Sequence, residues 1–274
     1  MSTKSQLFFL DLGLSNMQHG VSQGRIMTCD GDGKGLKAIL EGVGNQPDGL
    51  GITEDHMIVI PPGATFTPKQ LHLVPKHGKV YWCDREGMRV FRANLDGSDI
   101  EVLVTTGTSD ADRLDQRNWC VGIAVDHVRR FMYWTQKGPS KGNKGRLFRA
   151  GLDMPRGEDS TARSDIKLLL DHLPEPIDLD LDSEENALYL TDRGDPPFGN
   201  TVSKISLEQD VVQKTILIRK LHEAIGLALD VKNRMMYFAD LNGSLYKSKM
   251  DGSDEVTLLS EIGDLTGVAC LSVA

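Results

Sequence analysis

The sequence has few of the features that mark helical, disulfide-linked or membrane-spanning proteins. Aromatic residues make up 6% of the 274 positions, there are only four cysteines, and no CxxC pair occurs. No run of 18 apolar residues is present, so we expect no membrane-spanning helix. No long window shows the 3.6-residue period of an amphipathic helix. We therefore expect neither a helical bundle, nor a membrane protein, nor a disulfide scaffold.

A concentrated positive charge is also missing. The chain carries 31 Lys and Arg against 39 Asp and Glu, a formal net charge of −8, and its basic residues are scattered. Nucleic-acid binding is not expected, because it usually needs a basic face. The apolar stretch Leu7 to Leu10 is too short for the core of a signal peptide. Together with the unpaired cysteines, it predicts a cytoplasmic protein with reduced thiols.

What the sequence does contain is an internal repeat. A tetrad with an aromatic start recurs about every 50 residues, a spacing typical of repeat architectures. Three of the four tetrads follow a short apolar stretch that ends in Asp, as in Val121 to Asp126, and each tetrad precedes two further short stretches. Gly and Asp turns separate them. The four tetrads are Tyr81-Trp-Cys-Asp84, Tyr133-Trp-Thr-Gln136, Tyr189-Leu-Thr-Asp192 and Tyr237-Phe-Ala-Asp240.

Four short strands per unit are typical of the blades of a β-propeller. We predict an all-β propeller that forms a single domain over residues 1–274, with each tetrad on the second strand of its blade. Phe8 to Asp11 resembles a tetrad but has no first strand before it. Leu265 to Cys270 supplies that strand from the other end of the chain. The C-terminal strand should therefore complete the first blade and close the ring, which removes sheet edges.

One interval does not match the repeat. The stretch from Phe8 to Tyr81 is too long for one unit and too short for two. Gln46 to Gly49 resembles the start of a second blade, Thr53 to Ile60 an outer strand, and a new inner strand begins near Gln70. We predict a six-bladed plan with a truncated second blade; a five-bladed ring is the alternative. A gap there would expose an edge through which a homodimer could form.

The tetrads and the phrases after them resemble the YWTD repeat of the low-density lipoprotein receptor family. Trp82-Cys-Asp-Arg-Glu-Gly87 and Thr191-Asp-Arg-Gly-Asp-Pro196 look like the stand-alone YWTD proteins of fungi and bacteria. Within that group, the chain is similar to the hetero-Diels–Alder cyclases of fungal tropolone sesquiterpenoid pathways. The resemblance implies a cofactor-free enzyme of secondary metabolism that joins a tropolone o-quinone methide to a terpene alkene. It also implies that the Asp that closes three of the tetrads, Asp84, Asp192 and Asp240, is structural and forms bonds between blades.

In a four-stranded blade, the loop between strands two and three opens on the same face as the segment that leads into the next blade. Both sets of loops surround one mouth of the central channel, and pockets on such scaffolds combine apolar walls with a few polar groups. Non-recurring polar residues there are our candidates. For catalysis these are Lys69, Gln70, Glu175, His222 and Glu223; for substrate binding they are Thr67, Trp119, Cys120, Gln136, Lys137, Asp178, Arg193, Phe198 and Thr266.

These candidates have expected roles. His222 with Glu223, facing Glu175, could transfer protons near neutral pH. Lys69 and Gln70 could donate hydrogen bonds to a carbonyl oxygen.

Several of these features also have structural interpretations. Arg85 and Arg193 both follow a tetrad, which favours a recurring ion pair. Cys120 is more typical of a buried thiol than of a nucleophile. Ser140 to Gly145 suggests a long flexible rim and Asp159 to Asp165 a surface loop.

Two other function classes remain open. A metal-dependent hydrolase such as a lactonase could hold a hard cation with Glu175, Asp178, Asp48 and Asp264, although no EF-hand-like loop occurs. A scaffold propeller would bind a protein or peptide at the same rim and carry out no chemistry. The cofactor-free enzyme, acting on small molecules and binding no metal, is the leading expectation.

Overall fold

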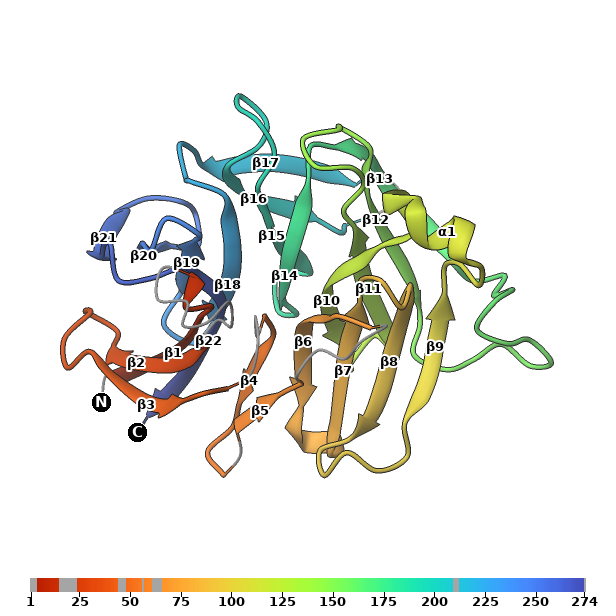
Figure 1. Cartoon of the computed structure of the whole chain (residues 1–274), viewed down its shortest axis with the longest axis horizontal. Helices are drawn as coiled ribbons and strands as arrows, with labels where there is room; N and C mark the ends of the chain where they lie inside the picture. Colours follow the sequence, from red (N-terminus) through yellow and green to blue (C-terminus); the bar gives the residue numbers. More distant parts are fainter. Residues whose placement is uncertain are drawn as a thin grey trace.

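The computed structural model describes residues 4–14, 24–43, 48–55, 57–60, 66–208 and 212–273. These residues form five antiparallel sheets of four strands each and one sheet of two strands. Figure 1 shows the sheets arranged as blades around a centre, with both chain ends at the same blade. The predicted all-β propeller is therefore confirmed.

Within each complete blade the strands follow one another from the centre outwards. The first blade consists of β22 (Leu265–Val273), β1 (Lys4–Asp11), β2 (Arg25–Asp30) and β3 (Lys37–Glu41). The next complete blade along the chain is β6 (Pro68–Val74), β7 (Lys79–Asp84), β8 (Arg89–Asn94) and β9 (Glu101–Thr105). The following two are β10 (Cys120–Asp126), β11 (Phe131–Gln136), β12 (Gly145–Gly151) and β13 (Lys167–Leu173), then β14 (Pro176–Asp182), β15 (Ala187–Asp192), β16 (Thr201–Ser206) and β17 (Gln213–Ile218). The last is β18 (Ala224–Asp230), β19 (Met235–Asp240), β20 (Leu245–Lys249) and β21 (Val256–Leu259).

Helix is scarce among the described residues. The α-helix α1 (Asp110–Leu114) and the 3-10 helices η2 (Pro75–His77) and η3 (Gln116–Asn118) are single turns. In the part of the chain that the structure describes, no helix is long and apolar enough to cross a membrane.

The C-terminal strand closes the ring, as predicted. β22 pairs antiparallel with β1, with Cys270 opposite Leu7 and Ala269 opposite Phe8. The first blade thus takes its inner strand from one end of the chain and its other strands from the opposite end. This pairing leaves no free edge at the joint, so separating the two ends requires breaking a whole strand ladder.

The predicted count of six blades is not confirmed. Between the first blade and β6 the described residues form only a two-stranded sheet, in which β4 (Leu50–Ile52) pairs with β5 (Met57–Val59) (Figure 1). Thr53 to Ile60 was expected to be an outer strand, but β5 lies directly beside β4. Gln46 and Pro47, expected to begin this unit, lie outside the described residues.

Glycines show that β4 nevertheless belongs to the ring of inner strands. A Cβ on Gly122 of β10 would lie 2.2 Å from the carbonyl oxygen of Ile177 on β14. A Cβ on Gly49, next to β4, would lie 2.2 Å from the carbonyl oxygen of Lys69 on β6. No side chain fits at either place, so glycine permits the close approach of neighbouring inner strands. The two-stranded sheet therefore takes an inner position in the ring.

The tetrads lie on the second strands β7, β11, β15 and β19, as predicted. Their closing Asp is structural, but its bonds run within the blade. Asp84 accepts hydrogen bonds from the backbone N–H groups of Thr67, 2.8 Å away, and Gly87. Asp192 does the same with Glu175 and Gly194. The expectation that this Asp forms bonds between blades is wrong. Its carboxylate instead accepts hydrogen bonds from backbone N–H groups, one of them in the segment that leads into its own blade.

The third tetrad residue forms the bonds between blades. Thr135 Oγ1 donates to the carbonyl oxygen of Ile177, 3.2 Å away, and Thr191 Oγ1 donates to that of Ile225, 2.6 Å away. Both hydroxyls also accept a backbone N–H. The buried hydroxyl and carbonyl groups are therefore paired across the junctions between blades. These bonds fix the positions of Ile177 and Ile225 along the axis of the ring.

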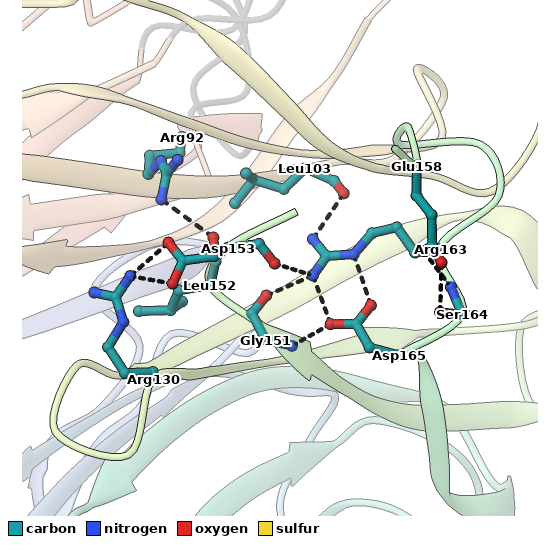
Figure 2. A network of polar contacts seen from close by, with 10 residues as sticks. All are labelled: Arg92, Leu103, Arg130, Gly151, Leu152, Asp153, Glu158, Arg163, Ser164 and Asp165. Atoms are coloured by element: carbon teal, nitrogen blue, oxygen red, sulfur yellow. Dashed lines mark hydrogen bonds and ion pairs between the residues drawn. The ribbon is translucent and has the colours of Figure 1, made fainter. Parts of the chain in front are cut away.

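The segment from Asp159 to Asp165 is not the simple surface loop expected from its polarity. The Arg163 side chain is fully buried and donates to the carbonyl oxygens of Leu103, Gly151 and Asp153. It also donates two hydrogen bonds to the Asp165 carboxylate. Figure 2 shows this guanidinium between β9 and the end of β12. Arg163 thus ties two neighbouring blades together from inside a polar loop.

Candidate functional site

A pocket lies where loops from several blades meet at one end of the ring. Its volume is about 150 Å³. The apolar side chains of Val121, Ile177 and Ile225 line it; each comes from the start of an inner strand, and they form one buried cluster. Because the tetrad hydroxyls hold the carbonyls of Ile177 and Ile225, the repeat itself builds this apolar floor. We call it the mouth pocket.

Four cationic side chains surround this floor. They are Lys69 on β6 and three residues next to strand ends, Arg85, Lys137 and Arg193. Trp119, which directly precedes β10, is the aromatic wall. The Arg85 guanidinium lies 5.1 Å from the Trp119 ring centroid and the Lys137 ammonium 5.9 Å from it. Cations over an aromatic face at this distance are attracted by the ring quadrupole.

The Trp119 ring is held in place by its indole N–H. This group donates to the carbonyl oxygen of Arg113, 2.8 Å away, in α1. The short helix itself begins with a capping box at Ser109 and Asp112, a device that stabilises helix starts. Local helix capping therefore orients the aromatic wall of the mouth pocket.

Glu175 organises the charges on one side of the pocket. Its fully buried carboxylate accepts from Lys137 Nζ at 2.7 Å and from Ser140 Oγ at 3.1 Å. The backbone N–H of Lys141 donates to its other oxygen. The loop from Ser140 to Gly145, predicted to be a long flexible rim, is anchored to Glu175 at its first two residues.

Arg193 has hydrogen-bonding capacity that the protein does not use. Its Nη2 lies 3.1 Å from Glu223, and its Nε lies 3.4 Å from Glu175. The Nε group is buried, yet it has no hydrogen-bond partner among the described residues. Buried N–H groups are normally satisfied. This Nε faces the Glu175 carboxylate at ion-pair distance, while the Arg193 side chain as a whole is 26% exposed and lines the mouth pocket.

Lys69 and Gln70 share one carboxylate on the other side. Lys69 Nζ lies 2.5 Å from Asp48 Oδ2, and Gln70 Nε2 donates to Asp48 Oδ1 at 3.2 Å. Asp48 and Lys69 line the mouth pocket, whereas Gln70 is buried and lines a separate cavity of about 190 Å³ between the inner strands. Asp178 also lines that cavity.

The electrostatics of the Lys137–Glu175 pair follow from its burial. Desolvation lowers the pKa of the Lys137 ammonium and outweighs the hydrogen bond that it donates to Glu175, which favours its charged form. Burial acts to raise the pKa of Glu175, but the hydrogen bond from Lys137 and the charge of Arg193 outweigh it, so this pKa lies below its usual value. The carboxylate is therefore ionised at neutral pH and keeps the neighbouring cations in position.

Of the predicted site residues, Lys69, Trp119, Lys137 and Arg193 line the mouth pocket. Glu175 and Glu223 both lie beside Arg193, so the two segments that contain them face each other, as predicted. His222 is exposed, and its side chain has no hydrogen bond or ion pair among the described residues; only its backbone N–H is bound, to Asp240. Proton transfer by a His222–Glu223 pair is therefore without geometric support.

The other predicted residues lie outside the mouth pocket. Phe198 is 63% exposed in a loop, while Gln136 and Thr266 are buried, and Thr67 contributes its backbone N–H to Asp84. Asp178 is buried and accepts from the backbone N–H groups of Leu179 and Leu227. Cys120 is fully buried, and desolvation raises the pKa of its thiol to about 12. Such a thiol does not act as a nucleophile.

Sequence reasoning missed Arg85, Gln116, Ser140 and the pocket role of Asp48. The signal for Arg85 was present, because Arg85 and Arg193 occupy the same position after their tetrads. We interpreted this recurrence as a structural ion pair. Side chains at equivalent positions in different blades point toward the same central axis. A residue type that recurs near a strand end is therefore also expected to gather around that axis.

The carboxylates considered for a metal ion do not converge. In the described part of the chain, no group of three His, Cys, Asp or Glu side chains is placed to hold a metal. Glu175 pairs with Lys137, Asp48 with Lys69, and Asp178 with backbone N–H groups.

Sequence comparison finds relatives that cover nearly the whole chain. A protein named low-density lipoprotein receptor-related protein 1 from Pyricularia oryzae is 41% identical over 98% of this chain and 99% of its own length. A protein named 3-hydroxyacyl-CoA dehydrogenase-like protein LAM1 from Cochliobolus heterostrophus is 36% identical over 98% of this chain. The present chain spans 65% of that second relative. A scan against protein-family models finds no match.

Structure comparison supports the fold. The crystal structure of a nidogen–laminin complex contains a chain that matches with a TM-score of 0.71 and 17% identity, over 98% of this chain and 100% of that one. TolB from Acinetobacter baumannii matches with a TM-score of 0.62 and 12% identity, over 97% and 66% of the two chains. At these identities the likeness concerns the propeller fold.

Proposed function

Since the chain belongs to the low-density lipoprotein receptor-related family of YWTD-type propellers, which has members in fungi, we propose that it is a cofactor-free enzyme that acts on a small organic molecule in the mouth pocket. The observation that carries this proposal is the Arg193 guanidinium, a partly exposed cation that lines a small pocket with an apolar floor. A ligand with an electron-rich oxygen and a flat apolar body satisfies both features.

The reaction we propose is the intermolecular hetero-Diels–Alder addition of a tropolone o-quinone methide to a terpene alkene. One C–O bond and one C–C bond form while three π bonds become one, and no group leaves. Negative charge builds up on the quinone methide oxygen as the bonds form. Donors fixed in a poorly hydrated site stabilise such charge more than water does. Arg193 and Lys137 are the donors that we assign to this oxygen.

The size of the pocket sets how the two reactants are held. A cavity of 150 Å³ accommodates a molecule about as large as benzene. The mouth pocket therefore seats the ring of the quinone methide between Trp119 and the apolar floor. The terpene then approaches from the open side. Holding both partners in a reactive arrangement converts a bimolecular step into an effectively unimolecular one.

The assay generates the o-quinone methide in buffer with the alkene present and follows the adduct by chiral chromatography. The wild-type protein should increase the rate and give one stereoisomer in excess. Arg193→Gln, which removes the charge, should lose about 10²-fold or more of the acceleration, the range seen when one such donor is removed. Arg156→Gln, an exposed residue far from the pocket in sequence, is the matched control and should keep it.

Two results would count against this proposal. A racemic adduct formed at the uncatalysed rate with wild-type protein would exclude the reaction. Full activity of Arg193→Gln would exclude the mouth pocket as its site.

The alternative is a propeller that binds a small molecule or protein without chemistry. The rim is built from ion pairs such as Lys69–Asp48 and Lys137–Glu175, and a charged rim of this kind suits binding whether or not a reaction follows. Calorimetry with tropolone distinguishes the two functions: saturable binding without turnover of the assay mixture would support the alternative. We do not propose the activity in the name of the LAM1 relative, because the described residues contain no strand–turn–helix unit of the kind that binds dinucleotides.

A further inference from the structure

A second, larger pocket lies on the outer part of the β6–β9 blade, on the face directed toward the two-stranded sheet. Its volume is about 400 Å³, and most of its lining is apolar. This volume falls within the range of small-molecule sites in proteins. We call it the lateral groove; it is lined by Ile60, Phe66, Trp82, Met88, Phe91 and Ile100, with Asp84, Arg89 and Arg113 among the polar residues.

The groove exists because the neighbouring unit is short. In the next blade, Trp134 occupies the tetrad position of Trp82 and is packed against Leu103 and Val104 of the preceding blade, at 1% exposure. Between the first blade and β6 the described residues form only β4 and β5, and among them no third or fourth strand covers the corresponding face. Phe66 and Ile100 are 44% and 64% exposed beside it. Contiguous exposed apolar surface of this kind usually marks an interaction site.

Two stacked aromatic rings form the floor. The rings of Trp82 and Phe91 are 4.9 Å apart and nearly parallel, at 9°. Trp82 is opposite Phe91 in the ladder between β7 and β8, so the pair is fixed by the sheet and does not need a ligand to form. A preformed flat apolar floor binds an apolar group at low entropic cost.

Positive charge completes the groove. Arg113 in α1 lines it, and its buried Nε has no hydrogen-bond partner among the described residues. Its ion pair with Asp110 spans 3.8 Å, and that Asp is almost fully exposed. Asp84, the acidic residue of the lining, is already engaged by the backbone N–H groups of Thr67 and Gly87. The lining therefore holds two cations, Arg89 and Arg113, against the single carboxylate of Asp84, and this excess of positive charge favours an anion.

We propose that the lateral groove is a binding site for an amphipathic organic anion, a carboxylate or similar group on an apolar body. The apolar body lies on the Trp82–Phe91 floor and extends toward Ile100, and the anionic group pairs with Arg113. A small ligand fits these features better than a second protein, because a stable protein interface needs about 800 Å² of surface on each partner. This site is distinct from the mouth pocket, because the two linings share no residue; Arg113 connects them only through its backbone carbonyl, which accepts from Trp119.

The test uses sodium decanoate as the probe, below its micelle concentration, with 1-decanol as the uncharged comparison. Isothermal titration calorimetry of the full chain should show saturable binding of one decanoate. Arg113→Gln should weaken decanoate binding about tenfold, a loss of about 1.4 kcal/mol, and leave decanol binding unchanged.

Ile100→Asp places a negative charge at the apolar end and should abolish decanoate binding. Val128→Asp changes an equally exposed apolar residue on another blade and should have no effect.

Each other outcome would overturn the inference. Wild-type protein that does not bind decanoate, or an Arg113→Gln variant with unchanged affinity, would exclude the anion site. Loss of decanoate binding in Arg193→Gln would assign the ligand to the mouth pocket instead. A concentration-dependent dimer in sedimentation analysis that Ile100→Asp dissociates would show that a second copy of the chain covers the groove.

Discussion

Replacing Glu175 by Gln should destabilise the protein strongly, because its buried carboxylate pairs with the nearly buried ammonium of Lys137. The Glu175 side chain is fully buried and that of Lys137 is 7% exposed, with 2.7 Å between the charged atoms. Removing one partner of a buried pair costs about 3–5 kcal/mol. Lys137 borders the mouth pocket and can recruit water there, so we expect the lower end, about 3 kcal/mol. The amide nitrogen would also face the Lys141 N–H, a contact between two donors.

The assay is thermal unfolding followed by circular dichroism at pH 7. A loss of about 3 kcal/mol corresponds to a decrease in Tm of about 6–12 °C for a domain of this size. Glu184→Gln, an exposed residue, is the control and should change Tm by less than about 1 °C. The double variant Lys137→Met with Glu175→Gln removes both charges and should recover part of the loss.

The effect of Glu175→Gln should also depend on pH. The pKa of Glu175 is lowered in the folded state, so its contribution is fully present above the unfolded pKa of about 4.3. It is lost as the pH falls through the lower folded value. The difference in Tm between wild type and variant should therefore shrink below about pH 4. A Tm within about 2 °C of wild type at pH 7, or a difference that grows on acidification, would refute this reasoning.

Three further predictions concern the scaffold. Arg163→Met should cost about 3 kcal/mol, because it leaves buried carbonyl groups without a donor; chemical denaturation measures this, and Arg156→Met in the same loop should be neutral. Thr191→Val should cost about 1–3 kcal/mol through loss of its bond between blades, against no loss for the exposed Thr215→Val, and equal stabilities would contradict that role. Burial raises the pKa of Cys29, Cys120 and Cys270 to about 12, so a thiol reagent at pH 8 should label the native protein slowly and all four cysteines only after unfolding. One fast-reacting thiol in the native state would show that a cysteine is accessible.

The sequence alone determined the repeat and the architecture that the repeat requires. Strand positions, the place of each tetrad and the closure of the ring by Leu265 to Cys270 all depend on local turn signals and on a period that recurs in register. The closing Asp residues were also identified as structural. The hydrogen-bond partners of these Asp residues were not identified. An Asp is needed at this position whether its hydrogen bonds lie within one blade or between two blades, so the sequence does not distinguish the two cases.

Only the tertiary structure decided which polar groups come together. Arg85 and Arg193 are far apart in the chain and meet at one pocket because each follows the second strand of its blade. Arg163 looked like part of a solvated loop, yet its buried side chain makes four hydrogen bonds within its own blade and one to Leu103 of the neighbouring blade. The lateral groove is present because the described residues before β6 form only the strands β4 and β5 between the first blade and β6. These two strands leave the outer part of one face of the β6–β9 blade uncovered. These properties come from the packing of blades around a common axis, and no local pattern of residues encodes that packing.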